Sequence, residues 1–190
     1  MRVIAGTCRS LKLKTPPGED VRPTTDRIKE TLFNIISSRV PGSDFLDLFC
    51  GCGAIGIEAL SRGAASSVFV DSSDVSLKYT RENLEFTRLK DAAEVIRSDA
   101  AGAISRLYSD GKRFDVIFMD PPYSKGLEEK VLRELSHFDI LKEDGVIIVE
   151  EKADTDLSYV DGLGFTITRE KRYGSNKHVF IARAEQAELS

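Results

Sequence analysis

From Asp44 onward the sequence alternates between short apolar runs and longer amphipathic segments, and this alternation restricts the fold more than any other feature. Five apolar runs predict strands: DFLDLF, SSVFVD, AEVIRS, FDVIFM and GVIIVE. Helices are predicted between them, at 53–63, 73–88, 100–109 and 127–136. Strands joined through helices run parallel, and a parallel sheet is covered on both faces. The pattern therefore predicts an α/β fold with a mostly parallel sheet and helices on both faces.

Both ends of the chain carry hairpin signals. The runs FTITREKRYG and KHVFIARAE, on either side of a turn at 174–176, predict a terminal antiparallel hairpin and bring the sheet to seven strands. At the other end, RVIA and LKLK predict a small N-terminal β-hairpin, and an amphipathic helix is expected from Thr24 to Arg39. We therefore expect an N-terminal basic arm at 1–23 and one domain at 24–190, a length that suits a single domain.

Charge is distributed unevenly along the chain. The net charge is −4, but residues 1–39 carry eight Lys/Arg against four Asp/Glu, so the remaining residues carry −8. A basic arm on an acidic body can meet phosphate locally while the body stays soluble. The alternative is a solvated hairpin whose charges have no partner. The cations that we consider are Arg2, Arg9, Lys12, Lys14, Arg22 and, in the terminal hairpin, Arg172.

A glycine-rich loop follows the first predicted strand, in 47-DLFCGCGAIGIEAL-60. Gly51, Gly53 and Gly56 form G-x-G-x-x-G at a strand-to-helix turn, and Asp71 ends the next strand, where a ribose-binding carboxylate is expected. Alone, this pattern fits a dinucleotide or an adenosyl cofactor equally well, or glycines needed only for close packing. Asp47 favours S-adenosyl-L-methionine (AdoMet), because a buried acid suits an ammonium group and repels a pyrophosphate. Asp99, after the third strand, is placed to meet an adenine edge.

The fourth strand ends in Asp120, Pro121, Pro122 and Tyr123. Prolines stop a strand, so one interpretation is a strand end with a stiff loop. The other is a clamp for a planar amine: the Asp120 carboxylate and the Pro121 carbonyl accept its two N–H groups, Pro122 keeps that carbonyl oriented, and Tyr123 stacks on the ring. Such a clamp acts by orientation and local electrostatics. Because the cofactor loop lies upstream, we favour amino methylation.

Several other classes are disfavoured. The three cysteines include only one close pair, Cys50 and Cys52, which argues for a reducing compartment and against a disulfide framework. With only two histidines, neither a metal cluster nor a Ser-His-Asp triad is expected. No apolar run approaches the roughly 20 residues that span a bilayer, and the N-terminus has no secretion signal. We predict no metal and no membrane association.

The sequence resembles the RsmD-type 16S ribosomal RNA guanine-N2 methyltransferases, which belong to the Rossmann-like class I AdoMet-dependent methyltransferases. The resemblance rests on 2-RVIAG-6, 22-RPTTDRIKETLFNII-36, 47-DLFCGCGAIGIEAL-60, 120-DPPY-123 and 173-YG-174. It differs from the family at Cys50 and Cys52, where Ala or Ser is usual, and at Asp71, where Glu is commoner.

The resemblance implies methylation of the guanine N2 amine in bacterial 16S rRNA, at guanine 966 in the family, by a cytoplasmic and monomeric enzyme acting on the small subunit or an assembly intermediate. Asp120, Pro121, Pro122 and Tyr123 would hold the guanine. The expected cofactor contacts are Asp47, Phe49, Gly51, Gly53, Gly56, Asp71, Asp99, Ala100 and Asp120.

Three alternatives remain open. The acceptor could be adenine N6 or a glutamine side-chain amide, because D-P-P-Y is shared with enzymes that act on both. An NAD-linked oxidoreductase is disfavoured by Asp47 and by D-P-P-Y. A catalytically inactive RNA-binding module is disfavoured because the glycine loop and D-P-P-Y are both intact.

Overall fold

The computed structural model describes residues 1–16, 25–123 and 125–184, with Thr25 lacking a described side chain. The chain forms two compact units, Met1–Asp99 and Ala100–Ser190. Within the described ranges, no helix is long and apolar enough to cross a membrane.

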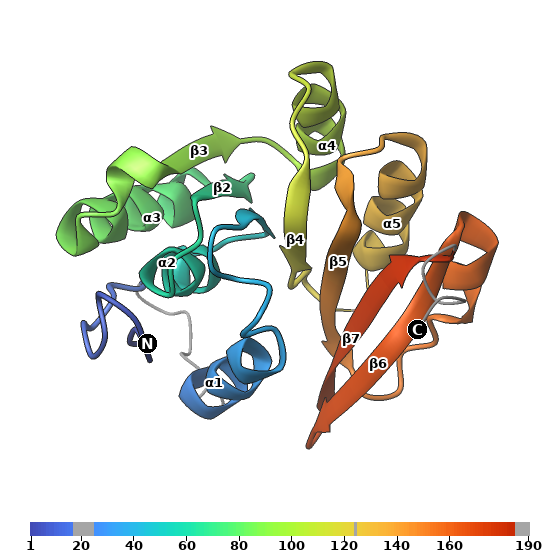
Figure 1. Cartoon of the computed structure of the whole chain (residues 1–190), viewed down its shortest axis with the longest axis horizontal. Helices are drawn as coiled ribbons and strands as arrows, with labels where there is room; N and C mark the ends of the chain where they lie inside the picture. The colour runs from blue at the N-terminus through green and yellow to red at the C-terminus, as the bar shows by residue number, and fades with distance from the viewer. Residues whose placement is uncertain (17–24, 124, 185–190) are drawn as a thin grey trace. The chain divides into compact units, whose positions relative to one another are not determined.

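The first unit is a parallel sheet with helices packed on it (Figure 1). Its strands are β1 (Asp44–Leu48), β2 (Ser66–Asp71) and β3 (Ala93–Arg97), in the order β3-β2-β1. Helix α2 (Ala54–Ser61) packs on β1 and β2, and α3 (Asp74–Thr87) packs on β2 and β3. Helix α1 (Thr25–Ile35) precedes the sheet, and the short 3-10 helix η1 (Lys90–Ala92) leads into β3. Four of the five β1 residues are buried, as expected for a strand covered on both faces.

The second unit contains the other four strands. β4 (Phe114–Met119) and β5 (Leu141–Lys152) are parallel, whereas β7 (Asn176–Arg183) is antiparallel to both β5 and β6 (Phe165–Tyr173). The order is β4-β5-β7-β6. Helix α4 (Ala100–Ser109) packs against α5 (Leu127–His137), and α5 also contacts the 3-10 helix η2 (Ser158–Leu163).

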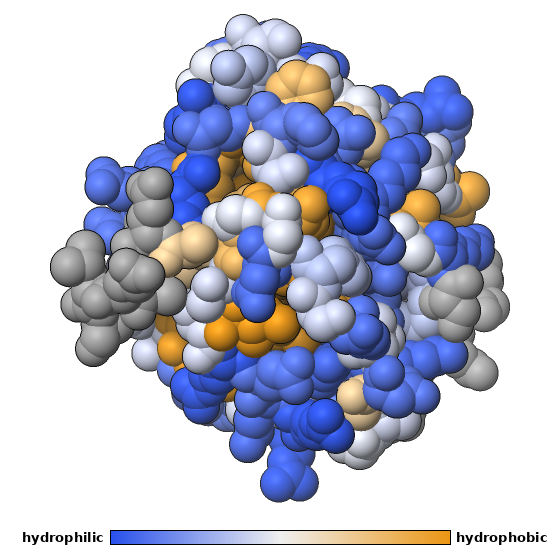
Figure 2. Space-filling model, turned by 90° about the vertical axis from the view of Figure 1, so that its right-hand side faces the viewer, coloured by the Kyte–Doolittle hydropathy of each residue, from blue (hydrophilic) through white to orange (hydrophobic). Residues whose placement is uncertain are grey.

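β6 is an edge strand with a charged exterior. Residues 168–172 are all exposed, and they include Arg169, Lys171 and Arg172. Figure 2 shows the side of the molecule that β6 borders: hydrophilic residues cover most of it, with hydrophobic residues visible between them. Charges along an edge strand discourage pairing with a second sheet, so this side can keep an exposed strand in water.

The prediction of a mostly parallel seven-stranded sheet with a terminal antiparallel hairpin is confirmed. The limits of some elements differ from the prediction. Helix α1 ends at Ile35 rather than at Arg39, because Ser37, Ser38 and the coming Pro41 all disfavour helix. β5 begins four residues earlier than predicted, at Leu141, since its charged start resembles a turn in sequence.

Within the described residues 1–16, the N-terminal segment is hairpin-like and has one β-bridge, between Arg2 and Lys12. Its backbone is closed by Val3 N–H donating to Leu11 O (2.9 Å) and Ser10 N–H donating to Val3 O (2.8 Å). It is packed into the first unit. Gly6 lies so close to α2 that a Cβ atom there would be 1.7 Å from the Ser61 carbonyl oxygen. The division into an arm at 1–23 and a domain at 24–190 stays a prediction.

Candidate functional site

The loop between β1 and α2 has an unusual backbone. Phe49, although it is not glycine, has φ 61°, and Gly51 and Gly53 have φ 54° and 81°. Two hydrogen bonds hold the turn: Cys50 N–H donates to Val70 O (2.9 Å) and Gly53 N–H donates to Cys50 O (2.8 Å). A non-glycine residue with positive φ is uncommon, and such residues gather at functional sites. A Cβ atom at Gly51 would meet nothing within 4 Å, so a ligand can approach the backbone there.

Gly56 has a packing role in this arrangement. A Cβ atom there would be 2.3 Å from Phe69 Cε1, so only glycine lets α2 approach β2 this closely. The Gly56 N–H donates to Asp47 Oδ2 (2.9 Å). Its predicted cofactor contact stays a prediction, because close packing by itself accounts for a glycine at this position.

Asp47 is buried, with 1% of its surface exposed. Burial raises the pKa of its carboxyl to about 7, since the charged form loses hydration; the Gly56 N–H lowers the pKa and Asp71 raises it further. A cation beside Asp47 would favour the ionised form. The predicted contact of Asp47 with the ammonium group of an amino-acid moiety stays a prediction.

Asp71 is half-buried at the end of β2 and shapes the loop directly. Its Oδ2 accepts from Gly51 N–H (2.9 Å) and its Oδ1 from Ser73 N–H (2.8 Å). A carboxylate has about four acceptor positions, so two remain for hydroxyl groups of a ribose. Asp99 is exposed at the end of the first unit, and Ala100 is buried at the start of α4.

Two buried residues of α3, which sequence reasoning missed, donate hydrogen bonds to carbonyl groups of the loop. Thr80 Oγ1 donates to Gly51 O (2.7 Å), and Asn83 Nδ2 donates to Cys52 O (3.0 Å). The same Asn83 amide also bonds the arm: Nδ2 donates to Lys14 O (2.9 Å) and Oδ1 accepts from Lys14 N–H (2.8 Å). A signal existed, because Thr80 lies at helical spacing from Leu77 and Leu84 on the buried face, and Asn83 follows Thr80 by three residues.

The arm is fixed by a second buried polar residue, Glu58 of α2. Its carboxylate accepts from Ile4 N–H (2.8 Å) and Ala5 N–H (3.0 Å), and pairs with Lys29 Nζ (3.1 Å) and Arg62 Nε (2.7 Å). Burial lowers the pKa of Lys29, and Glu58 opposes that change. The arm backbone is thus held in one conformation relative to α2.

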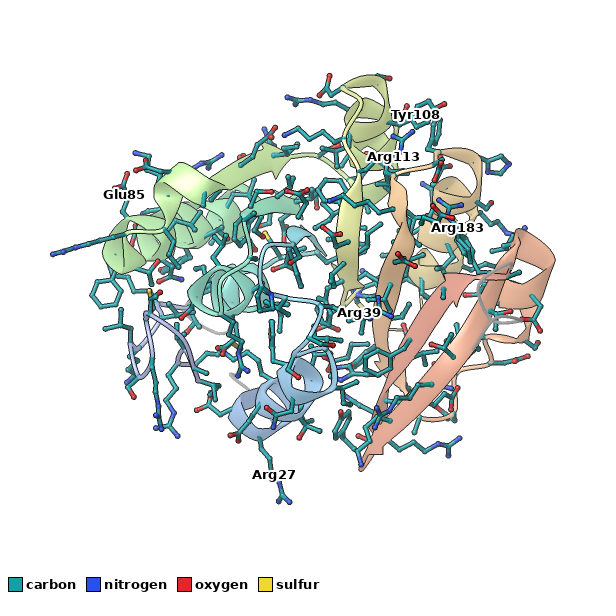
Figure 3. The ribbon with its side chains drawn as sticks, viewed as in Figure 1. Arg27, Arg39, Glu85, Tyr108, Arg113 and Arg183 are labelled. Carbon is teal, nitrogen blue, oxygen red and sulfur yellow. The ribbon has the colours of Figure 1, made fainter. Side chains whose placement is uncertain are left out.

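The predicted phosphate contacts of the arm lie on its surface. Arg9 and Lys12 are exposed. Arg2 and Lys14 are also exposed but pair with Asp26 (2.7 Å) and Glu82 (2.9 Å). In the same unit, Figure 3 shows Arg27 extending away from α1. Arg22 lies outside the described residues.

The D-P-P-Y segment follows β4 in the second unit. Asp120 and Pro122 are exposed, Pro121 is buried and Tyr123 is half-buried. The Tyr123 hydroxyl accepts a hydrogen bond from Asn176 Nδ2 (2.7 Å), and Lys152 Nζ lies 5.9 Å from the centre of the Tyr123 ring. The sequence did not indicate this link to the terminal hairpin. Arg172, the hairpin cation that we predicted as an RNA contact, is exposed on β6.

Another aromatic group of this unit lies elsewhere. The Arg113 guanidinium stacks 5.4 Å from the Tyr108 ring centre, and Tyr108 contacts Phe138. Figure 3 shows Tyr108 and Arg113 together near α4 and the start of β4, the opposite end of that strand from Asp120. This group is therefore separate from the D-P-P-Y segment.

Comparison with known proteins gives a consistent result. The family model described as conserved hypothetical protein 95 matches residues 1–182. The chain is 37% identical to YlbH of Bacillus subtilis over 174 residues, which cover 92% of this chain and 94% of YlbH. It is 33% identical to ribosomal RNA small subunit methyltransferase D of Escherichia coli, over 99% of this chain and 92% of that protein.

A solved structure agrees with these matches over the same length. The structure of yhhF from Escherichia coli superimposes with a TM-score of 0.84 at 33% identity, covering 96% of this chain and 97% of that one. The predicted Rossmann-like class I methyltransferase fold is thereby confirmed.

Proposed function

Because the chain belongs to the conserved hypothetical protein 95 family, the RsmD-type rRNA methyltransferases, we propose that it methylates the N2 amine of a guanine in bacterial 16S rRNA. The position would be guanine 966, as in the family. At the coarser level, the protein is an AdoMet-dependent rRNA methyltransferase. The observation that carries the proposal is that one match over residues 1–182 includes both the loop around Gly51 and the D-P-P-Y segment.

The first unit supplies residues that fit the cofactor. When bound, AdoMet provides a methyl group activated by its sulfonium. Asp47 would pair with the ammonium group, Asp71 would accept from the ribose hydroxyls, and Asp99 would bond the adenine edge. The hydrogen bonds that Asp71 accepts from Gly51 and Ser73 support this assignment, because they fix the loop before any ligand arrives.

The D-P-P-Y segment would hold the acceptor. The lone pair of an exocyclic amine is delocalised into its ring, so the amine is a poor nucleophile. The Asp120 carboxylate and the Pro121 carbonyl each accept one N–H, which leaves the lone pair directed at the methyl group, and Tyr123 stacks on the base. After transfer the cationic amine releases its proton easily, so Asp120 need not be a strong base. Each acceptor lowers the barrier by on the order of 2–4 kcal/mol, by analogy with the cost of removing one hydrogen-bond donor from an oxyanion hole.

RNA binding would rest on the exposed cations. Arg9 and Lys12, with Arg2 and Lys14, would contact phosphates from the arm, and Arg172 from β6. A paired guanine is out of reach, so the base must be unpaired or turned out of its helix. We propose that the enzyme acts as a monomer in the cytoplasm, on the small subunit or an assembly intermediate.

The test is a methyl-transfer assay with labelled AdoMet and unmethylated small subunits or naked 16S rRNA, followed by digestion to nucleosides. We expect the label in N2-methylguanosine. Label in N6-methyladenosine would overturn the guanine assignment. Absence of label in RNA, with transfer to a glutamine-containing protein, would overturn the RNA assignment.

A further inference from the structure

We propose that Asn176, at the tip of the β6–β7 hairpin, is a positioning residue that fixes the Tyr123 ring for stacking on the acceptor base. The inference rests on the proposed acceptor role of D-P-P-Y and extends it to a residue 53 positions away in sequence. The central contact is the 2.7 Å hydrogen bond from Asn176 Nδ2 to the Tyr123 hydroxyl. This bond restrains the hydroxyl end of the Tyr123 side chain, whereas the two preceding prolines restrict the backbone that carries it.

Asn176 itself is held on a firm support. It is the first residue of β7, and it lies opposite both Lys152 at the end of β5 and Tyr173 at the end of β6. The turn is also bonded to the segment after β5, because Ala153 N–H donates to Ser175 O (2.8 Å). In Figure 1 this turn lies at the end of the unit where β5 finishes. Two neighbouring strands therefore fix the position of the Asn176 amide.

The next residue on the same face of β7 strengthens that support. Successive residues of a strand alternate between faces, so His178 shares the face of Asn176. His178 is 1% exposed, and its Nε2 lies 3.0 Å from Glu150 Oε2. Its ring packs edge-on against Tyr173 (5.0 Å) and Phe118 (6.2 Å). Phe118 belongs to β4, the strand that leads into D-P-P-Y, so the hairpin and the D-P-P-Y strand share one packed cluster.

Lys152 provides a second interaction with Tyr123, at the face of its ring. Its Nζ lies 5.9 Å from the ring centre, within the range of a cation–π interaction. The ring of Tyr123 is thus restrained at its hydroxyl by β7 and at its face by β5. A ring restrained in this way loses little freedom when a base stacks on it, which is the benefit of preorganisation.

The test compares Asn176→Leu with Tyr123→Phe and with the double variant. Each single change removes the bond between the two side chains while keeping a similar branching and shape of the side chain. We expect each to reduce kcat on unmethylated small subunits about 10-fold or more, since small misplacements of reacting groups can cost up to about 100-fold. We also expect AdoMet Kd and Tm to change little. The double variant should be no worse than either single variant, because both act through one bond.

The matched control is Thr168→Val, which removes the hydrogen bond from Thr168 Oγ1 to Phe180 O (3.2 Å) elsewhere in the same hairpin. It should transfer methyl groups at the wild-type rate. Asn176→Asp should restore much of the loss, because its carboxylate can accept from the Tyr123 hydroxyl.

Three outcomes would overturn the inference: a normal kcat for Asn176→Leu, additive losses in the double variant, or an equal loss in Thr168→Val. Failure of the proposed function would appear differently, as a wild-type protein that places no label in N2-methylguanosine.

Discussion

The loop around Gly51 and the cluster around His178 both contain buried or half-buried polar groups, but they differ in how many of those groups find a hydrogen-bond partner. Around the loop, Asp71, Thr80 and Asn83 all bond backbone groups of the loop itself. Around the hairpin, the buried Tyr173 hydroxyl and His178 Nδ1 have no hydrogen-bond partner among the described residues. Five of the seven buried atoms of this kind belong to the second unit: Glu128 Oε2, Glu151 Oε1, Tyr159 OH, Tyr173 OH and His178 Nδ1.

This difference indicates that the stability of the two regions depends on their polar side chains to different degrees. In the loop region each polar side chain replaces water for a backbone group, so its removal leaves that group unpaired, at a cost of roughly 1–3 kcal/mol. In the hairpin cluster, removing an atom that bonds nothing leaves no group unpaired. The stability of the first region is therefore sensitive to polar-to-apolar changes, whereas the second should tolerate the loss of an atom such as the Tyr173 hydroxyl.

The largest effect on AdoMet affinity is expected for Asp71→Ala. The change removes two bonds to the loop backbone and the proposed ribose acceptor, and hydrogen bonds to charged groups contribute about 1.5–3 kcal/mol each. AdoMet affinity should fall about 10- to 100-fold in calorimetry. The matched change Asp74→Ala, at an exposed residue of α3 that pairs with Arg97, should leave the affinity unchanged. Equal affinities for Asp71→Ala and the wild type would remove Asp71 from the cofactor site.

Neutralising the arm should have the next largest effect. With Arg9, Lys12 and Lys14 all changed to Gln, RNA binding should weaken, and the slope of log K against log salt should become shallower by up to about 2, at roughly 0.7 for each lost single-strand phosphate contact. The control neutralises Arg106, Lys130 and Arg133 on α4 and α5. An unchanged slope in the arm variant would show that the arm does not contact phosphate.

The contrast between the regions can be measured directly by chemical denaturation. Asn83→Leu should lower the free energy of unfolding by about 1–3 kcal/mol, because it leaves Cys52 O and the Lys14 backbone unpaired. Tyr173→Phe should change it by less than about 0.5 kcal/mol, since the Tyr173 hydroxyl bonds no described residue. Comparable losses of unfolding free energy in the two variants would contradict the proposed difference between the loop region and the hairpin cluster.

A further effect concerns the pH dependence of stability. The pKa of Asp47 is about 7 in the folded protein against 3.8 for an ordinary aspartate. Between about pH 4 and pH 7 the unfolded chain therefore binds fewer protons at this residue than the folded one, so this contribution to stability falls as pH rises. Asp47→Asn should flatten that part of the pH profile of the cofactor-free protein. A profile parallel to that of the wild type would show that Asp47 does not titrate in this range.

Much of this fold was predictable because it depends on local periodicity. β2 and β4 have the limits that the apolar runs predict, and the predicted terminal hairpin is present. What the sequence could not indicate is pairing between distant polar residues. The bond between Tyr123 and Asn176, and the burial of Glu58 with Lys29, join positions whose separation has no periodic signature. Asn83 was also missed, because an asparagine inside a helix is usually exposed.

The most direct test of the proposed division of work is to measure both AdoMet affinity and methyl transfer in Asp120→Ala. In the proposed function Asp120 holds the acceptor amine, although the family resemblance also counts it among the cofactor contacts. We therefore predict a loss of transfer of about 100- to 1,000-fold with AdoMet Kd within several-fold of the wild type. A large loss of AdoMet affinity with normal turnover would contradict the account, because Asp120 would then serve the cofactor and not the acceptor.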